Sequence, residues 1–187
     1  MTPTAGQLKA IDEPTATNLG ELYDLAPLHW DDVRGTLATN LTQQPGSSGS
    51  RPPTFWLTTR DSDGSPHMTA IGAYWVDGRH YFCGGPRSRK IRNIERDPRC
   101  ALGVAIEGYD VALEGHAERV TDEAHLEQVA QVFAAGGWAA TVAEGGFTHQ
   151  FSAPSAGPPP WHVYRFTPEH VYAVMTGDPA GATHWTF

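Results

Sequence analysis

Several sequence patterns that mark common protein classes are missing from this chain. Its 187 residues include two cysteines, too few for a disulfide framework, and no Cys-x-x-Cys or His-x-x-x-His spacing offers a metal site. No apolar run approaches the roughly 20 residues that a membrane helix needs. The N-terminus has no basic start followed by an apolar stretch, as a signal peptide would have. We therefore expect a cytoplasmic protein without a membrane partner.

Motifs for nucleotide binding and for hydrolysis are missing as well. There is no Gly-x-Gly-x-x-Gly turn, no phosphate-binding P-loop and no Gly-x-Ser-x-Gly nucleophile elbow. Acidic residues outnumber basic residues by 21 to 13, which gives a net charge of −8. Because nucleic-acid-binding domains are usually basic, this balance argues against a nucleic-acid partner.

The length of the chain predicts a single domain. A chain of 187 residues can bury about 70% of its unfolded surface in one core. The first 26 residues are polar and show little periodicity. We interpret residues 1–26 as a mobile arm and residues 27–187 as the domain.

The basic residues are concentrated in one short window. Six of the 13 lie between Arg87 and Arg99, and because only Glu95 and Asp97 oppose them, the window carries a net charge of +4. The six are Arg87, Arg89, Lys90, Arg92, Arg96 and Arg99.

The position of this window indicates an anion site. A strand-like run ends in Cys83-Gly84-Gly85-Pro86, and Ser88 suits the N-cap of a short helix. Backbone N–H groups at a helix start attract anions, whereas cations such as Arg89 and Lys90 are unfavourable there unless an anion lies between them. The pattern therefore favours a small phosphate-like ligand, with a solvated basic face as the alternative.

Apolar spacing and turn signals predict a mainly β protein with peripheral helices. Alternation and hairpin signals, above all Asp77-Gly78, indicate six or seven short antiparallel strands, which favour a small barrel or sandwich. We expect strands at 55–59, 66–76, 79–83, 100–106, 109–120, 161–166 and 170–175. We expect helices from about Pro27, after Ser88 and from Asp122.

These features resemble the flavin-binding split-barrel superfamily, which includes pyridoxamine 5′-phosphate oxidases and actinobacterial deazaflavin oxidoreductases. The resemblance runs from about Phe55 to Val120 and is strongest at Ser88-Arg89-Lys90, at Arg96-Asp97-Pro98-Arg99 and in the Asp-Gly-x-Pro turn that starts at Asp63. It implies a six-stranded antiparallel split β-barrel of the pyridoxamine phosphate oxidase type. It also implies a homodimer with two cofactor sites at the subunit interface.

The resemblance further implies which residues bind the cofactor. Arg89 and Lys90 would hold its phosphate with help from Ser88. The ring system would lie along the strand of Thr69, Ala70 and Ile71, and Cys83 and Gly84 would supply backbone contacts. No side chain stands out as a catalytic acid or base, because the cofactor of a redox enzyme performs the difficult step.

One position separates the branches of the superfamily. Pyridoxamine phosphate oxidases carry an Arg on the strand after the Gly-x-Pro turn, where this chain has Thr69, and the deazaflavin branch lacks that Arg as well. We therefore expect the deazaflavin coenzyme F420, whose acidic tail could meet Arg87 and Arg92, and hydride transfer to or from a small organic substrate. Flavin mononucleotide (FMN) is the alternative cofactor. A non-catalytic cofactor carrier and a haem-binding split barrel are the alternative functions.

Apolar residues also suggest how the chain is assembled. The strands from Phe55 to Val76 carry apolar residues on both faces, so one face needs a cover. We expect a homodimer that buries more than about 2,000 Å², with the helix from Asp122 as the alternative cover. The terminal Trp185 and Phe187 would dock on a cofactor ring or on the partner subunit.

Overall fold

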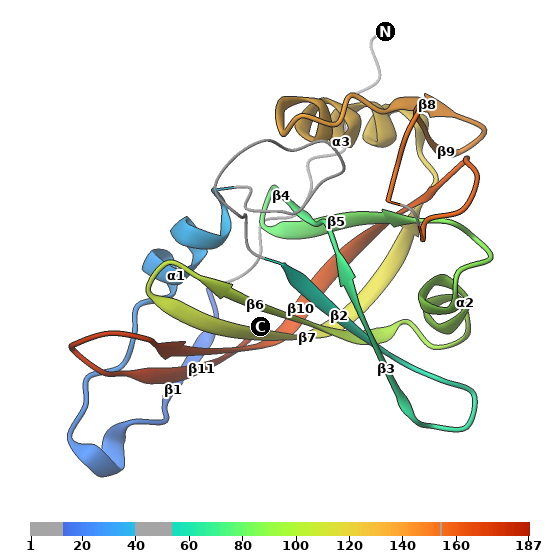
Figure 1. The fold of residues 1–187 in the computed structure, drawn as a ribbon. Coiled ribbons are helices and arrows are strands. Elements are labelled where there is room, and N and C mark those ends of the chain that lie inside the picture. Colours follow the sequence, from blue (N-terminus) through green and yellow to red (C-terminus); the bar gives the residue numbers. More distant parts are fainter. Residues whose placement is uncertain (1–12, 40–53, 154) are drawn as a thin grey trace, which may run out of the picture.

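A computed structural model describes residues 13–39, 54–153 and 155–187 as a mainly β fold (Figure 1). Its helices are the 3-10 turn η1 (Glu21–Tyr23) and the α-helices α1 (Trp30–Leu37), α2 (Arg89–Arg96) and α3 (Glu123–Ala135). Its strands are β1 (Thr15–Asn18), β2 (Phe55–Arg60), β3 (Pro66–Ile71), β4 (Tyr74–Val76), β5 (Arg79–Gly84), β6 (Arg99–Ile106), β7 (Tyr109–Val120), β8 (Thr141–Ala143), β9 (Gly146–Thr148), β10 (His162–Met175) and β11 (Ala182–Thr186).

Nine of the strands form one antiparallel sheet. Its main order is β1-β11-β10-β7-β6-β2-β3, and β5 branches from β10 and pairs with β4. The prediction of a mainly β antiparallel fold is confirmed, but the strand count exceeds six, and the pairings among the described residues do not close the sheet into a barrel. The sheet is larger because β1 and β11 extend it beyond β10.

β10 is a single 14-residue strand where the sequence predicts two strands. Pro168 suggests a break because it has no N–H to donate to a ladder. The sheet accommodates the proline by a register shift between Pro168 and His170, where β10 pairs with β7. β10 therefore joins β5 at one end to β11 at the other.

Local turn chemistry accounts for the β4–β5 hairpin. Asp77 and Gly78 have φ values of 48° and 84°, as a two-residue hairpin turn requires. The strand predicted over residues 66–76 is interrupted, because β3 ends at Ile71 and β4 begins at Tyr74.

The N-terminal segment differs from the predicted arm in its described part. β1 pairs with β11 instead of leaving the domain, and residues 1–12 lie outside the described residues. The C-terminus docks within its own chain: Trp185 is buried, and the ring centroids of Trp185 and Phe187 lie 5.4 and 5.1 Å from that of Trp30.

Two apolar clusters stabilise the fold. The first is the main core, in which side chains of the large sheet pack on one another, among them Leu57, Phe82 and Phe166. The second lies where α3 and the β8–β9 hairpin cover β4 and β5 (Figure 1), with the centroid of Phe133 on α3 4.5 Å from that of Tyr74 on β4. None of the described helices is long and apolar enough to cross a membrane.

Candidate cofactor-binding site

The helix α2 carries the basic window and begins where β5 ends. Ser88 is its N-cap, and Ile91 and Ile94, one turn apart, are buried against the sheet. The helix stops at Arg96 because Pro98 disfavours helical backbone in the residue before it. Apolar packing on one face thus fixes the direction of every basic side chain on α2.

A pocket of about 380 Å³ lies beside the start of this helix. Five of the predicted cofactor-binding residues line it, namely Ala70, Ile71, Cys83, Gly84 and Lys90. Their strands β3 and β5 and the helix α2 form one side of the pocket. The other lining residues are Gly72, Phe133, Trp138, Ser152, Ala153, Ser155, Ala156 and Trp161.

Two glycines at the end of β5 allow close packing around the pocket. A Cβ on Gly84 would lie 2.9 Å from Cγ1 of Ile91 and 3.1 Å from Cε of Lys90. A Cβ on Gly85 would lie 2.1 Å from the carbonyl oxygen of Ala156. The absence of side chains therefore brings α2 and the segment around Ala156 against the strand.

Polar groups at the start of α2 have no partner among the described residues. The Ser88 hydroxyl caps no backbone N–H, and its Oγ is buried without a hydrogen bond. The Lys90 ammonium makes no hydrogen bond or ion pair with a described residue, and its burial lowers its pKa from the ordinary value. Unpaired buried donors are unfavourable unless a ligand satisfies them.

Arg89 faces a different way from Lys90. Its Nε donates to Oδ1 of Asp61 at 2.9 Å, and its Nη2 is bonded to Oδ2 of the same carboxylate. Hydrogen bonds from Arg89 and then Asn93 hold the pKa of Asp61 well below its usual range. Consecutive helical residues point about 100° apart, so only Lys90 reaches the pocket.

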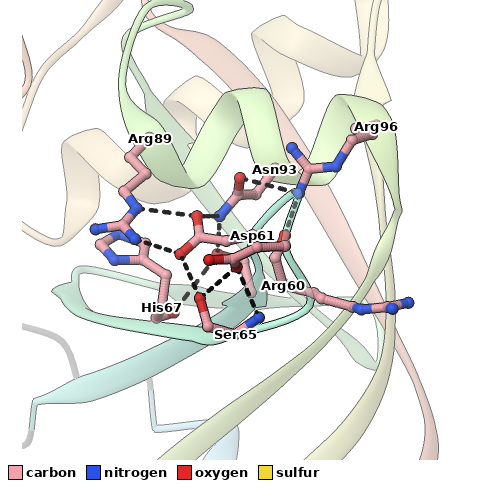
Figure 2. A network of polar contacts seen from close by, with 9 residues as sticks. Arg60, Asp61, Ser65, His67, Arg89, Asn93 and Arg96 are labelled. Atoms are coloured by element: carbon pink, nitrogen blue, oxygen red, sulfur yellow. Dashed lines mark hydrogen bonds and ion pairs between the residues drawn. The ribbon is translucent and has the colours of Figure 1, made fainter.

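Asn93 extends this network between α2 and β2 (Figure 2). Its buried amide donates to Oδ1 of Asp61 at 2.9 Å and to Oγ1 of Thr59 at 3.1 Å, and its Oδ1 accepts from Arg96. The network fixes the β2–β3 turn to α2. In this arrangement, the Arg89 guanidinium is paired with Asp61 while its side chain stays 57% exposed.

The remaining predicted residues lie outside the pocket. Arg87 and Ser88 line a second groove, which shares the lining residues Ser155 and Ala156 with the pocket and therefore adjoins it. Arg92 donates to the carbonyl oxygen of Arg87 at 3.0 Å.

Thr69 lies on β3 opposite Leu57 of β2. Its Oγ1 is 3.5 Å from the carbonyl oxygen of Ala70, and it is not among the residues that line the pocket. The predicted ring-side strand thus contributes Ala70 and Ile71 to the pocket.

The sequence analysis missed the residues from the segment after α3. The indole N–H of Trp138 donates to the carbonyl oxygen of Phe151 at 3.0 Å, and that of Trp161 donates to Gly157 at 3.0 Å. These bonds hold the segment that supplies Ser152, Ala153, Ser155 and Ala156. A pair of tryptophans on either side of a Gly- and Pro-rich stretch was the signal available in the sequence.

Among the described lining residues, Lys90 and Cys83 are the titratable side chains. Burial raises the pKa of the Cys83 thiol to about 12, although the nearby Lys90 charge opposes that rise. Neither a histidine nor a carboxylate belongs to the described lining, and no cluster of metal-ligating side chains occurs in the described ranges. The described lining can therefore bind and orient a reactive group.

Comparison with known proteins identifies both a family and a fold. The model of the pyridoxamine 5′-phosphate oxidase family matches residues 49–175. No curated protein sequence matches the chain significantly.

Solved structures share the fold at low sequence identity. A heme binding protein from Mycobacterium smegmatis has a TM-score of 0.56 and 16% identity over 84% of this chain and 59% of its own. A conserved hypothetical protein from Mycobacterium tuberculosis has a TM-score of 0.55 and 20% identity, over 78% and 84% of the two chains. A putative pyridoxamine 5′-phosphate oxidase from Listeria innocua has a TM-score of 0.52 and 15% identity, over 76% and 95%.

Proposed function

The chain belongs to the pyridoxamine 5′-phosphate oxidase family, and on that premise we propose that it is an oxidoreductase that binds a flavin-type cofactor in the pocket beside α2. One observation carries the proposal: the Lys90 ammonium lines the pocket and has no partner among the described residues. A cofactor phosphate in the pocket would pair with it, and charge-assisted hydrogen bonds to phosphate are stronger than neutral ones. The start of α2 adds backbone N–H groups aimed at the same charge.

The remaining lining residues fit a planar ring system. Ala70, Ile71 and Gly72 offer a run of backbone with apolar side chains or none, and the aromatic residues of the lining add apolar surface. When bound, the cofactor supplies hydride transfer. The protein holds the phosphate, orients the ring and keeps the site dry for a small organic substrate.

Coenzyme F420 fits the site better than FMN. The second groove adjoins the pocket, and Arg87 lines it, so an acidic tail that extends from the phosphate into this groove would meet a positive charge. By the resemblance to pyridoxamine phosphate oxidases, Thr69 stands on the strand where those enzymes carry an Arg. Both features favour a ligand with negative charge along the groove rather than at one phosphate.

A haem-binding role is less well supported by the pocket. Haem iron in proteins is usually held by an axial His, Cys, Met or Tyr. In the described part of the lining, Cys83 is the one such residue, and burial raises its thiol pKa to about 12, so the thiolate ligand is disfavoured.

The test is a spectroscopic titration of the purified protein with F420, FMN and haem. We expect saturable binding of F420, weaker binding of FMN and no Soret shift with haem. Oxidation of reduced F420 by an added organic acceptor then distinguishes an enzyme from a carrier. A protein that purifies yellow with FMN and ignores added F420 would contradict the choice of F420, and failure to bind either flavin would contradict the proposed function.

A further inference from the structure

The pocket beside α2 contains little charge. Of its described lining residues, Lys90 is the one that carries a formal charge at neutral pH, and no carboxylate faces the cavity. Under the proposed function, the cofactor phosphate neutralises Lys90. A second anion entering the same pocket would find no further cation among the described lining residues.

The neighbouring arginines do not supply a second cation to the pocket. Arg89 is paired with Asp61, and Arg92 is bonded to the backbone of Arg87. Arg87 lines the second groove and not the pocket. An unpaired anion brought into a partly buried apolar site loses hydration without compensation.

The wall that follows α3 is also poor in free hydrogen-bond donors. Phe133, Trp138 and Trp161 pack on one another, with the Trp138 centroid 5.9 Å from that of Phe133 and 5.5 Å from that of Trp161. Both indole N–H groups already donate to backbone carbonyls. The uncharged hydroxyls of Ser152 and Ser155 are the polar side chains that this wall contributes within the described lining.

We infer that the substrate of this site is an uncharged, largely apolar ring compound and not a phosphate ester. The inference rests on the proposed function, because it assigns Lys90 to the cofactor phosphate. Aromatic and small apolar side chains would bind the ring, and the two serine hydroxyls would select one or two hydrogen-bonding groups on it. For a substrate of the pyridoxamine 5′-phosphate type, the described lining of the pocket offers no second cation that could bind the substrate phosphate.

Two probes with the same ring test the charge preference. 2-Naphthol is neutral at neutral pH, whereas naphthalene-2-sulfonate carries one negative charge. We expect cofactor-loaded protein to bind 2-naphthol at least about tenfold more tightly in equilibrium dialysis, because the sulfonate has no cation to pair with. Equal or tighter binding of the sulfonate, or no binding of 2-naphthol by cofactor-loaded protein, would overturn the inference.

A charge placed in the wall should reverse the preference. Ala153 is exposed and lines the pocket, so Ala153→Lys adds a cation there without disturbing the core. We expect this variant to bind naphthalene-2-sulfonate at least about threefold more tightly than wild type. Ala180→Lys, at an exposed position in the β10–β11 turn, is the matched control and should leave both affinities unchanged.

These outcomes separate the two proposals. A protein that binds neither F420 nor FMN refutes the proposed function before any probe is added. Normal cofactor binding combined with an unchanged probe ratio in Ala153→Lys refutes only the substrate class.

Discussion

Two adjacent basic residues on α2 have different roles. Lys90 faces the pocket without a partner among the described residues, whereas Arg89 is bonded to Asp61. The sequence resemblance assigns both residues to a phosphate. The helical geometry of α2 points only one of them toward the pocket.

Alanine variants of these two residues should therefore behave differently. Lys90→Ala should weaken cofactor binding by at least about tenfold, because a charge-assisted hydrogen bond contributes roughly 1.5–3 kcal/mol. Arg89→Ala should change cofactor affinity by less than about threefold and should lower the unfolding midpoint, because Asp61 and Asn93 lose a partner. Spectroscopic titration and thermal unfolding of both variants measure these effects. Equal losses of affinity would mean that Arg89 leaves Asp61 to bind the phosphate.

At the scale of elements, one buried histidine packs against side chains of two neighbouring strands. His80 on β5 is fully buried, and its ring centroid lies 5.0 Å from both that of Phe55 on β2 and that of Trp75 on β4. Neither ring nitrogen has a hydrogen-bond partner within the described part of the chain. Burial lowers the pKa of His80 from 6.5 to about 3, so the packing of these strands depends on a neutral ring.

This burial predicts a loss of stability in mild acid. The unfolded chain takes up a proton as pH falls through 6.5, whereas the folded chain does not until about pH 3. The contribution of neutral His80 to the free energy of unfolding is thus fully present above pH 6.5. Below pH 6.5, and down to about pH 3, this contribution falls by about 1.4 kcal/mol per pH unit. Between pH 7 and pH 5, we expect wild type to lose roughly 2 kcal/mol more free energy of unfolding than His80→Phe.

Urea unfolding at the two pH values measures this difference. His29→Gln, which replaces an exposed histidine, is the control and should follow wild type. A His80→Phe variant with the same acid dependence as wild type would show that His80 becomes protonated without cost in the folded protein.

At the scale of the whole molecule, an apolar face lies beside the pocket. Trp56 and Met68 are 48% and 62% exposed on β2 and β3, and α3 covers β4 and β5 instead of this face. Trp56 pairs directly with Ala70, which lines the pocket. A second copy of the chain that covered Trp56 would therefore also border the cofactor site.

We propose a homodimer formed through this face, and Trp56→Glu tests it. The introduced charge should convert the protein to monomers in sedimentation velocity and weaken cofactor binding by at least about tenfold, because a buried unpaired charge is strongly unfavourable at an interface. Leu22→Glu, at an 85% exposed position on η1, is the control and should preserve the dimer. A wild-type monomer that binds cofactor at full affinity would refute the shared site.

The sequence by itself determined the features that depend on neighbouring residues. Asp77 and Gly78 predict their hairpin because the turn needs positive φ at both positions, and Ser88 and Pro98 bound the basic helix α2. The mainly β class followed from the same local signals. The prediction of two strands around Pro168 was wrong. A proline disfavours a strand because it lacks an N–H donor, but a sheet can accommodate it at a β-bulge, as β10 does.

Only the tertiary structure decided which residues share the pocket. Lys90 and Trp138 are far apart in sequence, and they line one pocket because the segment after α3 packs against the end of β5. The separation of Arg89 from Lys90 likewise depends on Asp61, which arrives from the end of β2. Side-chain contacts between distant segments are set by the packing of the sheet and helices, and local patterns in the sequence do not encode them.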